Sequence, residues 1–460
     1  MKIAVIGAGV AGLGAAWLLN RKHEVVIYER EDRFGGHSCT VDAPVAGGTR
    51  AVDVGFIVFN QRNYPNLVAL FDHLGVPTEA SDMSFAVSLD KGRFEYGSSF
   101  GGYFGQRRNV VRPSFLRMTH DILRFNRLAP RLLDKCEDLD FTIGDFIDDA
   151  GLSDTFRDRY LVPMASCIWS TPLGRMLDYP AQSFVRFFNN HGLLTIGPQL
   201  QWRTVSGGSR SYVERIATPL RAQARLATPA RAIRRGPLGV QVRDASGHWD
   251  RFDKIVLACH ADQTLALLED ADGPERQLLG RFAYSSNEVW LHGDLSLMPK
   301  RRSVWSSWNY VADRRSDKAR AEEASVSVTY WMNRLQNLPE ETPLFVSVNP
   351  GRAPLPATAY ARFAFEHPMY DAAAIRAQRG LHAIQGVRDT YFCGSYCGYG
   401  FHEDALSAGL DVAEQLGVRR PWPRPDEHRR IGDPPRVVAD RPILDPFPLP
   451  VAARIATETS

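Results

Sequence analysis

The 460-residue sequence predicts an α/β fold, in which a Rossmann-like, two-dinucleotide-binding domain carries an inserted α+β domain. Two patterns indicate the nucleotide-binding part. One is a strand, glycine-rich turn, helix and second strand at the N-terminus, and the other is a strand that ends at glycine before a helix near residues 391–416. The third observation is length, because a chain of this size needs two or three hydrophobic cores.

The N-terminal unit has every part of a mononucleotide-binding βαβ motif. The apolar strand Lys2–Ile6 leads into a G-x-G-x-x-G turn and a helical run over Leu13–Asn20, and a second strand, Val25–Tyr28, ends at an acid. Such a turn lets a pyrophosphate approach the backbone amides at the start of the helix, whereas the acid accepts hydrogen bonds from ribose. The residues predicted to do this are Gly7, Gly9, Val10, Ala11, Gly12 and Glu29. A glycine-rich turn without a ligand is the alternative.

A second glycine pair follows the acid. The segment Arg33–Ser38 (R-F-G-G-H-S) resembles the R-x-G-G segment that flavoproteins of the amine oxidase and phytoene desaturase superfamily place directly after the ribose acid. NAD-only dehydrogenases lack this extension, so the resemblance implies FAD. In the superfamily, an acid and a glycine such as those of Asp53–Phe56 bring the backbone beside the flavin ring, although a plain strand–turn is the alternative. The FAD contacts implied here are Arg30, Gly35, Gly36, His37, Ser38, Gly55 and Phe56.

The far end of the sequence resembles the C-terminal flavin motif of the superfamily. Tyr391–Ser395 is a predicted strand ending at glycine, and Gly400–Ala405 leads into a helical run over Leu406–Leu416 whose N-terminus would point at the flavin. The sequence departs from the motif at Ser395, where aspartate is usual. The contacts implied are Gly394, Ser395, Phe401, His402, Glu403, Asp404 and Ala405. A predicted strand over Leu226–Ile233 corresponds to the one that packs on adenine, which makes Ala230 a further candidate.

These motifs define a discontinuous FAD-binding domain over 1–60, 200–270 and 385–418. The pieces between them, 61–199 and 271–384, form the predicted substrate-binding domain, and the first of these is mainly helical. Residues 419–460 contain nine prolines and several arginines, which predicts an extended tail with little core of its own.

Charge and cysteine usage narrow the classes of protein. The net charge of +3 gives no bias toward nucleic acid. The six cysteines form no C-x-x-C pair, so no metal site is expected, and free thiols in a reducing cytoplasm are the simpler interpretation. The N-terminus lacks a signal-peptide cleavage pattern, and no apolar run is long enough to span a bilayer.

A basic stretch raises the question of a membrane. Between Arg107 and Lys135 there are eight basic and two acidic residues; Arg117, Arg124 and Arg131 recur every seven positions. Phe115, Met118, Ile122 and Phe125 fall on the opposite side of a helical wheel. The pattern is typical of an amphipathic helix that contacts the inner membrane peripherally through 107–135. The alternative is a helix that buries this apolar face in its own domain.

The resemblance extends beyond the nucleotide motifs, to a bacterial family described as predicted NAD/FAD-binding proteins. It is carried by 52–60, 201–209, 305–310, 330–336 and 391–405. Members are linked to modified membrane fatty acids and resemble the desaturase of furan fatty acid synthesis, so the implied substrate is a methylated or unsaturated acyl chain of a phospholipid. The implied reaction is hydride transfer from an activated C–H bond to flavin N5, while a base removes the neighbouring proton. Candidates for that base are Tyr330, Tyr396 and His402.

An acyl chain needs a long apolar tunnel. Aromatic residues that could line one are Trp305, Trp308, Tyr310, Phe345, Phe363, Phe365 and Tyr370, although ordinary core packing uses the same residues. Three other functions share the FAD signals. A flavin amine oxidase usually has a lysine near flavin N5, and none of the seven lysines is well placed; a carotenoid-type desaturase or isomerase would act on polyenes; a non-enzymatic flavoprotein would bind FAD that no lipid reduces.

The mode of FAD attachment is the last inference from sequence. Cys393 and Cys397 are the obvious residues for a thioether to flavin, but covalent cysteines of the superfamily usually precede the final strand motif, whereas these lie within or after it. Noncovalent FAD is therefore expected.

Overall fold

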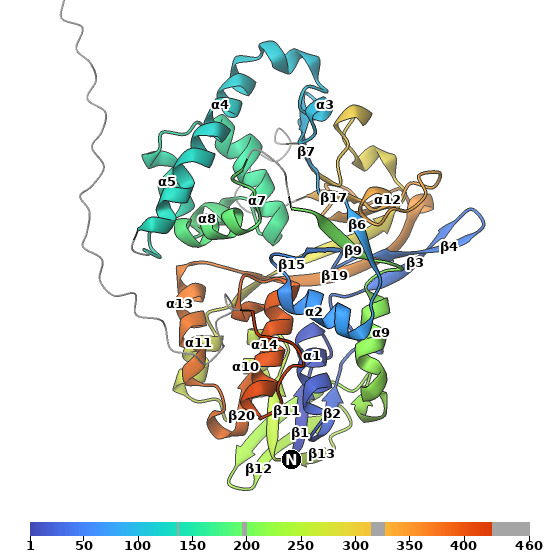
Figure 1. Cartoon of the computed structure of the whole chain (residues 1–460), viewed down its shortest axis with the longest axis vertical. Helices are drawn as coiled ribbons and strands as arrows, with labels where there is room; N and C mark the ends of the chain where they lie inside the picture. Colours follow the sequence, from blue (N-terminus) through green and yellow to red (C-terminus); the bar gives the residue numbers. More distant parts are fainter. Residues whose placement is uncertain (136–137, 196–199, 314–326, 426–460) are drawn as a thin grey trace, which may run out of the picture.

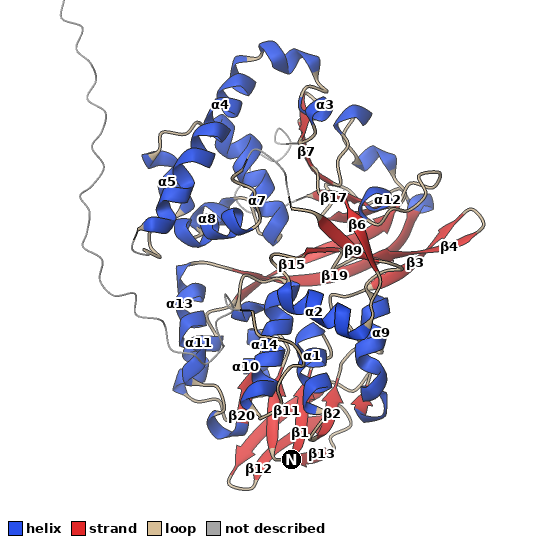
Figure 2. Cartoon of the chain, viewed as in Figure 1, coloured by secondary structure: helices blue, strands red, loops and turns tan. Residues whose placement is uncertain are grey.

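The computed structural model describes residues 1–135, 138–195, 200–313 and 327–425. Figure 1 shows a parallel sheet with its helices at one end of the molecule, a large mixed sheet in the middle and a helical lobe beside it. Figure 2 shows how the helices separate into those that cover the parallel sheet and those of the lobe. The predicted α/β class, with a Rossmann-like FAD domain and a second, substrate-binding part, is confirmed.

The parallel sheet has the strand order β10-β2-β1-β14-β20. Its strands are β1 (Lys2–Ile6), β2 (Glu24–Tyr28), β10 (Ala224–Arg225), β14 (Lys254–Leu257) and β20 (Thr390–Phe392). Short runs of valine and isoleucine form β1, β2 and β14, because both faces of the sheet are covered. The helices α1 (Val10–Leu19) and α14 (His402–Gln415) pack side by side above it and share one core. Segments from both ends of the chain therefore build this sheet.

Smaller elements surround the parallel sheet. An antiparallel hairpin sheet lies beside it, formed by β11 (Ala230–Gly236), β12 (Gly239–Asp244) and β13 (Trp249–Phe252). The other helices around the parallel sheet are α2 (Pro65–Leu74), α9 (Arg210–Ala217), α10 (Ala261–Leu267), α11 (Gly273–Leu279) and α13 (Ala372–Gly380). Leu67, Leu70 and Phe71 of α2 lie in the same core as α1 and α14, although residue 60 marks the predicted end of the first FAD-binding segment.

The mixed sheet has the order β19-β15-β18-β17-β16-β7-β8. Adjacent strands in this sheet run antiparallel, except β16 and β7, which run parallel. The strands are β7 (Phe85–Leu89), β8 (Phe94–Gly97), β15 (Ala283–His292), β16 (Trp308–Ala312), β17 (Val328–Trp331), β18 (Phe345–Val348) and β19 (Ala359–Met369), with the short helix α12 (Met332–Leu335) after β17. Two small sheets connect it to the rest: β3 (Thr40–Val45) with β4 (Gly48–Asp53), and β5 (Val58–Asn60) with β9 (Trp202–Val205) and β6 (Thr78–Ser81).

The helical lobe comes from residues 100–190. It contains α3 (Phe100–Tyr103), α4 (Pro113–Leu128), α5 (Ile143–Asp149), α6 (Asp154–Phe156), α7 (Val162–Trp169) and α8 (Ala181–Asn190). None of the helices in the described ranges is both long and apolar enough to cross a membrane.

The apolar face of the amphipathic helix predicted near 107–135 packs inside the protein. Phe115, Met118 and Phe125 of α4 are buried inside the protein. On the other side, the buried carboxylate of Asp121 accepts from Arg117 at 3.0 Å and lies 3.4 Å from Arg124. The helix also ends at Leu128, before Arg131, because Ala129–Asp134 forms a 3-10 turn with Pro130 at its second position. The apolar face of this helix therefore stabilises the lobe, which agrees with the alternative interpretation that the helix buries this face in its own domain.

One other sequence-based boundary was wrong. The strand predicted over Leu226–Ile233 begins only at Ala230, because Ala227 has a left-handed backbone with φ +50° and donates its N–H to the carbonyl of Glu31. The start of the predicted tail packs on the rest of the protein where it is described: Arg420 is buried and Trp422 stacks on Trp17. The rest of that tail, 426–460, lies outside the described residues.

Candidate functional site

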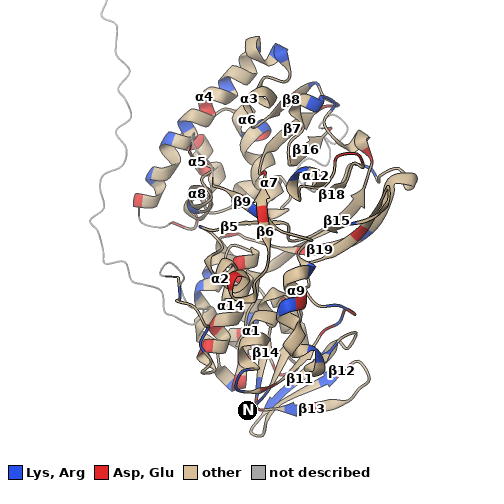
Figure 3. Ribbon diagram, turned by 45° about the vertical axis from the view of Figure 1, so that its right-hand side comes forward, with Lys and Arg blue, Asp and Glu red and all other residues tan. Residues whose placement is uncertain are grey.

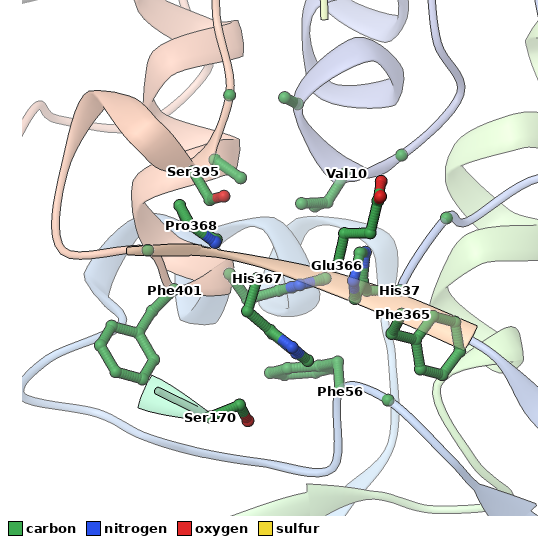
Figure 4. A pocket seen from close by; sticks show the side chains of 18 of the residues that line it. Val10, His37, Phe56, Ser170, Phe365, Glu366, His367, Pro368, Ser395 and Phe401 are labelled. Atoms are coloured by element: carbon green, nitrogen blue, oxygen red, sulfur yellow. The ribbon is translucent and has the colours of Figure 1, made fainter. Parts of the chain in front are cut away.

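A cavity of about 1110 Å³ lies between the parallel sheet and the mixed sheet. Its wall includes Gly7, Glu29, Ala258 and Gly394, which follow β1, β2, β14 and β20 within two residues, at the carboxyl ends of four parallel strands. This edge is where open α/β sheets bind nucleotides. The opposite wall is β19, which crosses the view of Figure 4 and contributes consecutive residues from 363 to 368.

The turn after β1 leaves room for a phosphate group. A Cβ at Gly12 would lie 1.9 Å from the carbonyl oxygen of Gly7, so helix α1 packs directly on the turn. A Cβ at Gly9 would meet nothing within 4 Å, because this residue faces the cavity. The N–H of Gly35 donates to the carbonyl of Ala8 at 2.8 Å, which joins the two glycine motifs into one surface. The spacing predicted from sequence thus yields an exposed amide cradle at a helix N-terminus.

Glu29 follows β2 and is held in place by the loops that it joins. Its Oε2 accepts the N–H of Ala8 at 2.6 Å, and its Oε1 accepts the N–H of Glu31 at 3.0 Å. The residue is 8% exposed and lines the cavity. A carboxylate fixed at the end of the second strand, one strand away from the phosphate turn, has the position expected for binding ribose hydroxyls.

A histidine takes the place after the second glycine pair. His37 packs against Phe365, with ring centroids 4.9 Å apart, and its buried Nε2 has no hydrogen-bond partner among the described residues. Burial, together with the neighbouring His367 and His260, holds the pKa of His37 well below its ordinary value. A buried polar atom without a partner costs free energy unless a ligand satisfies it. Its place on the cavity wall, beside β19 in Figure 4, is therefore a sign of a missing polar ligand.

The other end of the cavity has a flat aromatic wall. The imidazole of His402, the first residue of α14, stacks on Phe56 with centroids 4.0 Å apart and an interplanar angle of 11°. Its Nε2 lies 2.5 Å from the hydroxyl of Tyr212 and 3.2 Å from Ser38 Oγ. Burial lowers the pKa of His402 to about 3, so the ring is neutral. The N-terminus of α14 thus opens on the cavity beside a planar surface.

Most residues predicted to contact the cofactor line this cavity. They are Gly7, Gly9, Val10, Ala11, Glu29, Arg30, Gly35, Gly36, His37, Gly55, Phe56, Ala230, Gly394, Ser395, Phe401, His402 and Ala405. Gly12 and Ser38 lie just behind the wall, where they pack and hydrogen-bond with the residues in front of them.

Glu403 and Asp404 have structural contacts instead. Glu403 accepts the N–H groups of Asn66 and Leu67 at 2.9 Å, so its carboxylate caps the start of α2 rather than facing the cavity. Asp404 accepts the N–H of Phe401 at 2.9 Å in a capping box of α14. Burial raises the pKa of Glu403 to about 7 and that of Asp404 to about 6. The sequence could not show the contact with α2, because the two segments are more than 300 residues apart.

The three candidates for the base lie on different elements. Tyr330 is on β17, and its ring meets Trp308 edge-on at 4.9 Å in the apolar part of the wall. Tyr396 follows β20, packs on Phe282 at 5.1 Å and has a buried hydroxyl with no partner among the described residues. Burial raises the pKa of both tyrosines well above the ordinary value, so both hydroxyls stay protonated.

The aromatic tunnel predicted from sequence is partly wrong. Trp308, Phe363 and Phe365 line the cavity. Tyr310, Phe345 and Tyr370 are buried in cores, and Trp305 packs on Trp331 and Phe345 away from the cavity, because their strands turn these side chains to other faces. Sequence reasoning also missed Glu366 and His367 on β19 and Met164 on α7. No sequence motif marks the residues of these two elements that line the cavity.

These observations fit FAD. The amide cradle, the fixed ribose acid, the unpartnered His37 nitrogen and the flat wall at α14 occur in the order in which a dinucleotide with a planar ring would meet them. No cluster of three metal-binding side chains occurs within the described part of the chain.

Comparison with known proteins identifies the family. Residues 10–417 match the model of the flavin containing amine oxidoreductases, which covers most of the chain. The chain belongs to this family. It is therefore an FAD-dependent oxidoreductase of the amine oxidase superfamily, and the cofactor predicted from the R-x-G-G segment is confirmed.

The proteins similar to this chain have names that point to different substrates. The chain is 25% identical over 338 residues to a putative flavin-containing monoamine oxidase, AofH, from Mycobacterium tuberculosis, which covers 71% of this chain and 70% of that protein. A fatty acid isomerase from P. acnes that produces CLA has a similar structure, with a TM-score of 0.64, 17% identity, and coverage of 90% of this chain and 98% of the other. Cyclohexylamine oxidase from Brevibacterium oxydans has the same TM-score and identity, with coverage of 90% and 99%. At these identities, the two structures show the fold alone.

Proposed function

We propose that this flavoenzyme dehydrogenates methylated or unsaturated fatty acyl chains of membrane phospholipids, as in furan fatty acid biosynthesis. The observation that carries the proposal is the wall of the cavity beyond Phe56. It is formed mainly by apolar side chains from β7, α7, β16, β17 and β19, among them Phe85, Met164, Ile168, Trp308 and Phe363. A long, uncharged chain gains most from such a wall, because each buried CH₂ group contributes about 0.8 kcal/mol.

Charged groups in the wall argue in the same direction. The carboxylates that line the cavity are Glu29, Glu31 and Glu366, and Figure 4 shows Glu366 directed toward Val10 at the phosphate turn. None of the lysines among the described residues lines the cavity, and Lys318 lies outside them. An amine substrate would therefore find neither a carboxylate for its ammonium form beyond Phe56 nor the lysine usual beside flavin in amine oxidases.

Two further findings support a lipid substrate. A protein that acts on fatty acids is among the similar structures, so this fold can hold an acyl chain. The cavity also reaches Ser98, which is exposed to solvent as well as part of the wall. An exposed wall residue marks a mouth through which a chain could be inserted at the end far from the nucleotide.

The residues that line the cavity are sufficient for this reaction, which needs no strongly basic group. Bound FAD supplies the hydride acceptor. Loss of hydride leaves positive charge on an allylic or branched carbon, which makes the neighbouring C–H bond acidic, so a neutral base is sufficient to take the proton. The neutral imidazole of His402 satisfies this requirement, whereas the protonated Tyr330 hydroxyl would orient the chain. The apolar side chains exclude water from the charge that develops.

The test is anaerobic reduction of the flavin. Purified protein is mixed with vesicles that contain methyl-branched or cis-unsaturated acyl chains, and absorbance is followed at about 450 nm, where oxidised flavin absorbs. We expect bleaching with these lipids and none with saturated lipids or simple amines. Bleaching by amines alone would contradict the proposal and favour an amine oxidase; bleaching by polyenes alone would favour a carotenoid-type enzyme.

A variant at the cavity mouth adds a structural control. Ser98→Trp should slow bleaching by lipid roughly tenfold, as expected from a loss of about 1.4 kcal/mol of transition-state stabilisation, without reducing bound FAD. Ser246→Trp, at an exposed turn of the hairpin sheet, should leave the rate unchanged. Equal rates in the two variants would show that the acyl chain does not pass Ser98.

A further inference from the structure

We propose that the tip of the helical lobe is a docking surface for an anionic phospholipid bilayer. The surface, here called the apical patch, consists of the exposed apolar residues Phe100, Phe104, Val110, Val111 and Leu116 together with Arg107, Arg108 and Arg112. It rests on one continuous segment, from α3 through the 3-10 turn Arg107–Val111 to the start of α4.

The apolar side chains of the patch are unusually exposed. Phe100 is 88% exposed and Val111 is 78% exposed, and the other three are each at least 40% exposed. Single exposed hydrophobic residues are ordinary on a protein surface, but five within 17 positions of one segment are an unusual concentration of the kind found at interaction sites. Phe100 and Phe104 contact each other edge-on at 5.9 Å, so the two rings form one surface.

The patch is distinct from the amphipathic face that the sequence suggested. Phe115 and Met118 are buried beneath it and support it from inside. Tyr103 packs on Phe115 at 4.9 Å and on Phe104 at 5.3 Å, which connects the exposed rings to the core of the lobe. A rigid base of this kind holds the exposed side chains outward instead of allowing them to collapse onto the protein.

The three arginines of the patch have no carboxylate partner among the described residues. The guanidinium groups of Arg108 and Arg112 both donate to the backbone carbonyl of Arg93, so they lie close together. Burial and the charge of Arg108 lower the pKa of Arg112. No carboxylate of a described residue forms an ion pair with Arg107, Arg108 or Arg112, and the neighbouring Glu95 is buried and pairs with Arg301. Converging cations without an acid are suited to the phosphates of anionic lipids.

The position of the patch agrees with a membrane contact. Figure 1 shows α3 and the start of α4 at the end of the molecule opposite the parallel sheet, and Figure 3 shows basic positions at this end and along α4. Phe100 is two residues from Ser98, which lies at the mouth of the cavity. If the proposed function holds, a bilayer under the patch would place acyl chains at this mouth. The binding itself does not depend on that function.

The combination of exposed apolar side chains and arginines in one patch favours a bilayer over nucleic acid or a second copy of the chain. Nucleic acid would satisfy the arginines but leave Phe100 and Val111 in water. A second copy of the chain would bring like charges together at the contact. An anionic membrane interface satisfies both kinds of group, because apolar side chains insert below the headgroups while arginines remain at the phosphates.

The experiment is sedimentation of the FAD-loaded protein with vesicles, without turnover. The vesicles contain only saturated acyl chains, with either phosphatidylglycerol or phosphatidylcholine headgroups, so that binding is separated from the proposed reaction. We expect binding to phosphatidylglycerol that weakens with salt, and at most weak binding to phosphatidylcholine. No binding to phosphatidylglycerol vesicles would overturn the proposal, whatever the enzyme's substrate proves to be.

Paired variants locate the contact. Phe100→Ser/Val111→Ser and Arg107→Gln/Arg108→Gln should each weaken binding to phosphatidylglycerol about tenfold or more. Leu238→Ser and Arg251→Gln, exposed positions of the distant hairpin sheet, should bind like the wild type. Equal binding by patch and control variants would overturn the assignment. The assignment would also be overturned if the wild type were an oligomer that the patch variants convert to monomers, because a second copy would then cover the patch. Unchanged thermal midpoints of the variants exclude misfolding.

Discussion

At the scale of single residues, Glu29 connects the geometry of the protein to cofactor binding. Its carboxylate accepts two backbone N–H groups, from Ala8 and Glu31, and lies on the cavity wall. Glu29→Gln keeps the size of the side chain but loses the charge and one acceptor, so we expect FAD to bind roughly 10 to 100 times more weakly, since hydrogen bonds to charged groups contribute about 1.5–3 kcal/mol. The ratio of flavin to protein absorbance and a titration with FAD measure this. Glu24→Gln, exposed on the same strand, should bind FAD normally.

A second residue, His292, links stability to pH. It is buried, its Nδ1 accepts the N–H of Asp294 at 3.0 Å, and its Nε2 meets Ser347 Oγ at 2.8 Å. Burial, together with the charge of Arg352, lowers its pKa from 6.5 to about 4. The unfolded chain binds this proton first as the pH falls, so the stabilisation is present above pH 6.5 and is lost between pH 6.5 and 4.

The expected loss from this residue is about 3 kcal/mol over the window. His292→Asn can still accept the Asp294 N–H but cannot titrate, so the variant should be less stable at neutral pH and show a flatter decline toward pH 4. Urea unfolding at several pH values measures both. His248→Asn, on an exposed turn, should keep the wild-type decline. A His292→Asn curve parallel to that of the wild type would show that folding does not lower the pKa of His292.

At the scale of elements, the segment after α14 acts as a strap. Arg420 is buried, donates to Asn66 Oδ1 and Glu414 Oε1, each at 2.8 Å, and pairs with Asp411. Asn66 in turn hydrogen-bonds to Glu403 at the start of α14, so the strap joins α2 and α14 behind the cavity. Removing one partner of a buried ion pair leaves uncompensated charge, which costs about 3–5 kcal/mol.

Arg420→Gln should therefore lower the free energy of unfolding by about 3 kcal/mol, as measured by urea denaturation. The neighbouring Arg419 is exposed, and Arg419→Gln should change it by no more than about 0.5 kcal/mol. If the two variants were equally stable, the strap would contribute nothing, and the segment would behave as the free tail that composition alone predicts.

The elements also show how far sequence reasoning reaches. The unit from β1 to Glu29 could be predicted because its function depends on local spacing: the strand, turn, helix and acid are consecutive. The contacts of Glu403 with α2 and the face of β19 toward the cavity could not, because each depends on which distant segment packs there. The helical periodicity of α4 could be predicted, but not what its apolar face packs against. An apolar face that is buried in the protein and one that faces a membrane have the same sequence pattern.

At the scale of the whole molecule, the cavity joins parts that could not form it separately. The parallel sheet supplies the cradle and the ribose acid, whereas β19 and the neighbouring strands supply the wall beyond the ring. A ligand that bridges the two parts binds the folded state alone and must stabilise it. Removal of FAD should therefore lower the thermal midpoint by several degrees, and added FAD should restore it in proportion to the logarithm of its concentration.

The same architecture predicts that FAD is held without a covalent bond. Cys393 is fully buried in the core under α14, and neither Cys393 nor Cys397 is part of the cavity wall. Burial raises the pKa of both thiols well above the ordinary value, so neither forms the thiolate that attacks an electrophilic ring. Acid precipitation should leave the yellow colour in the supernatant, and the precipitated protein should have the mass of the bare chain. A yellow pellet that keeps its colour through washing would instead require a thioether, and Cys393→Ala and Cys397→Ala would identify which thiol forms it.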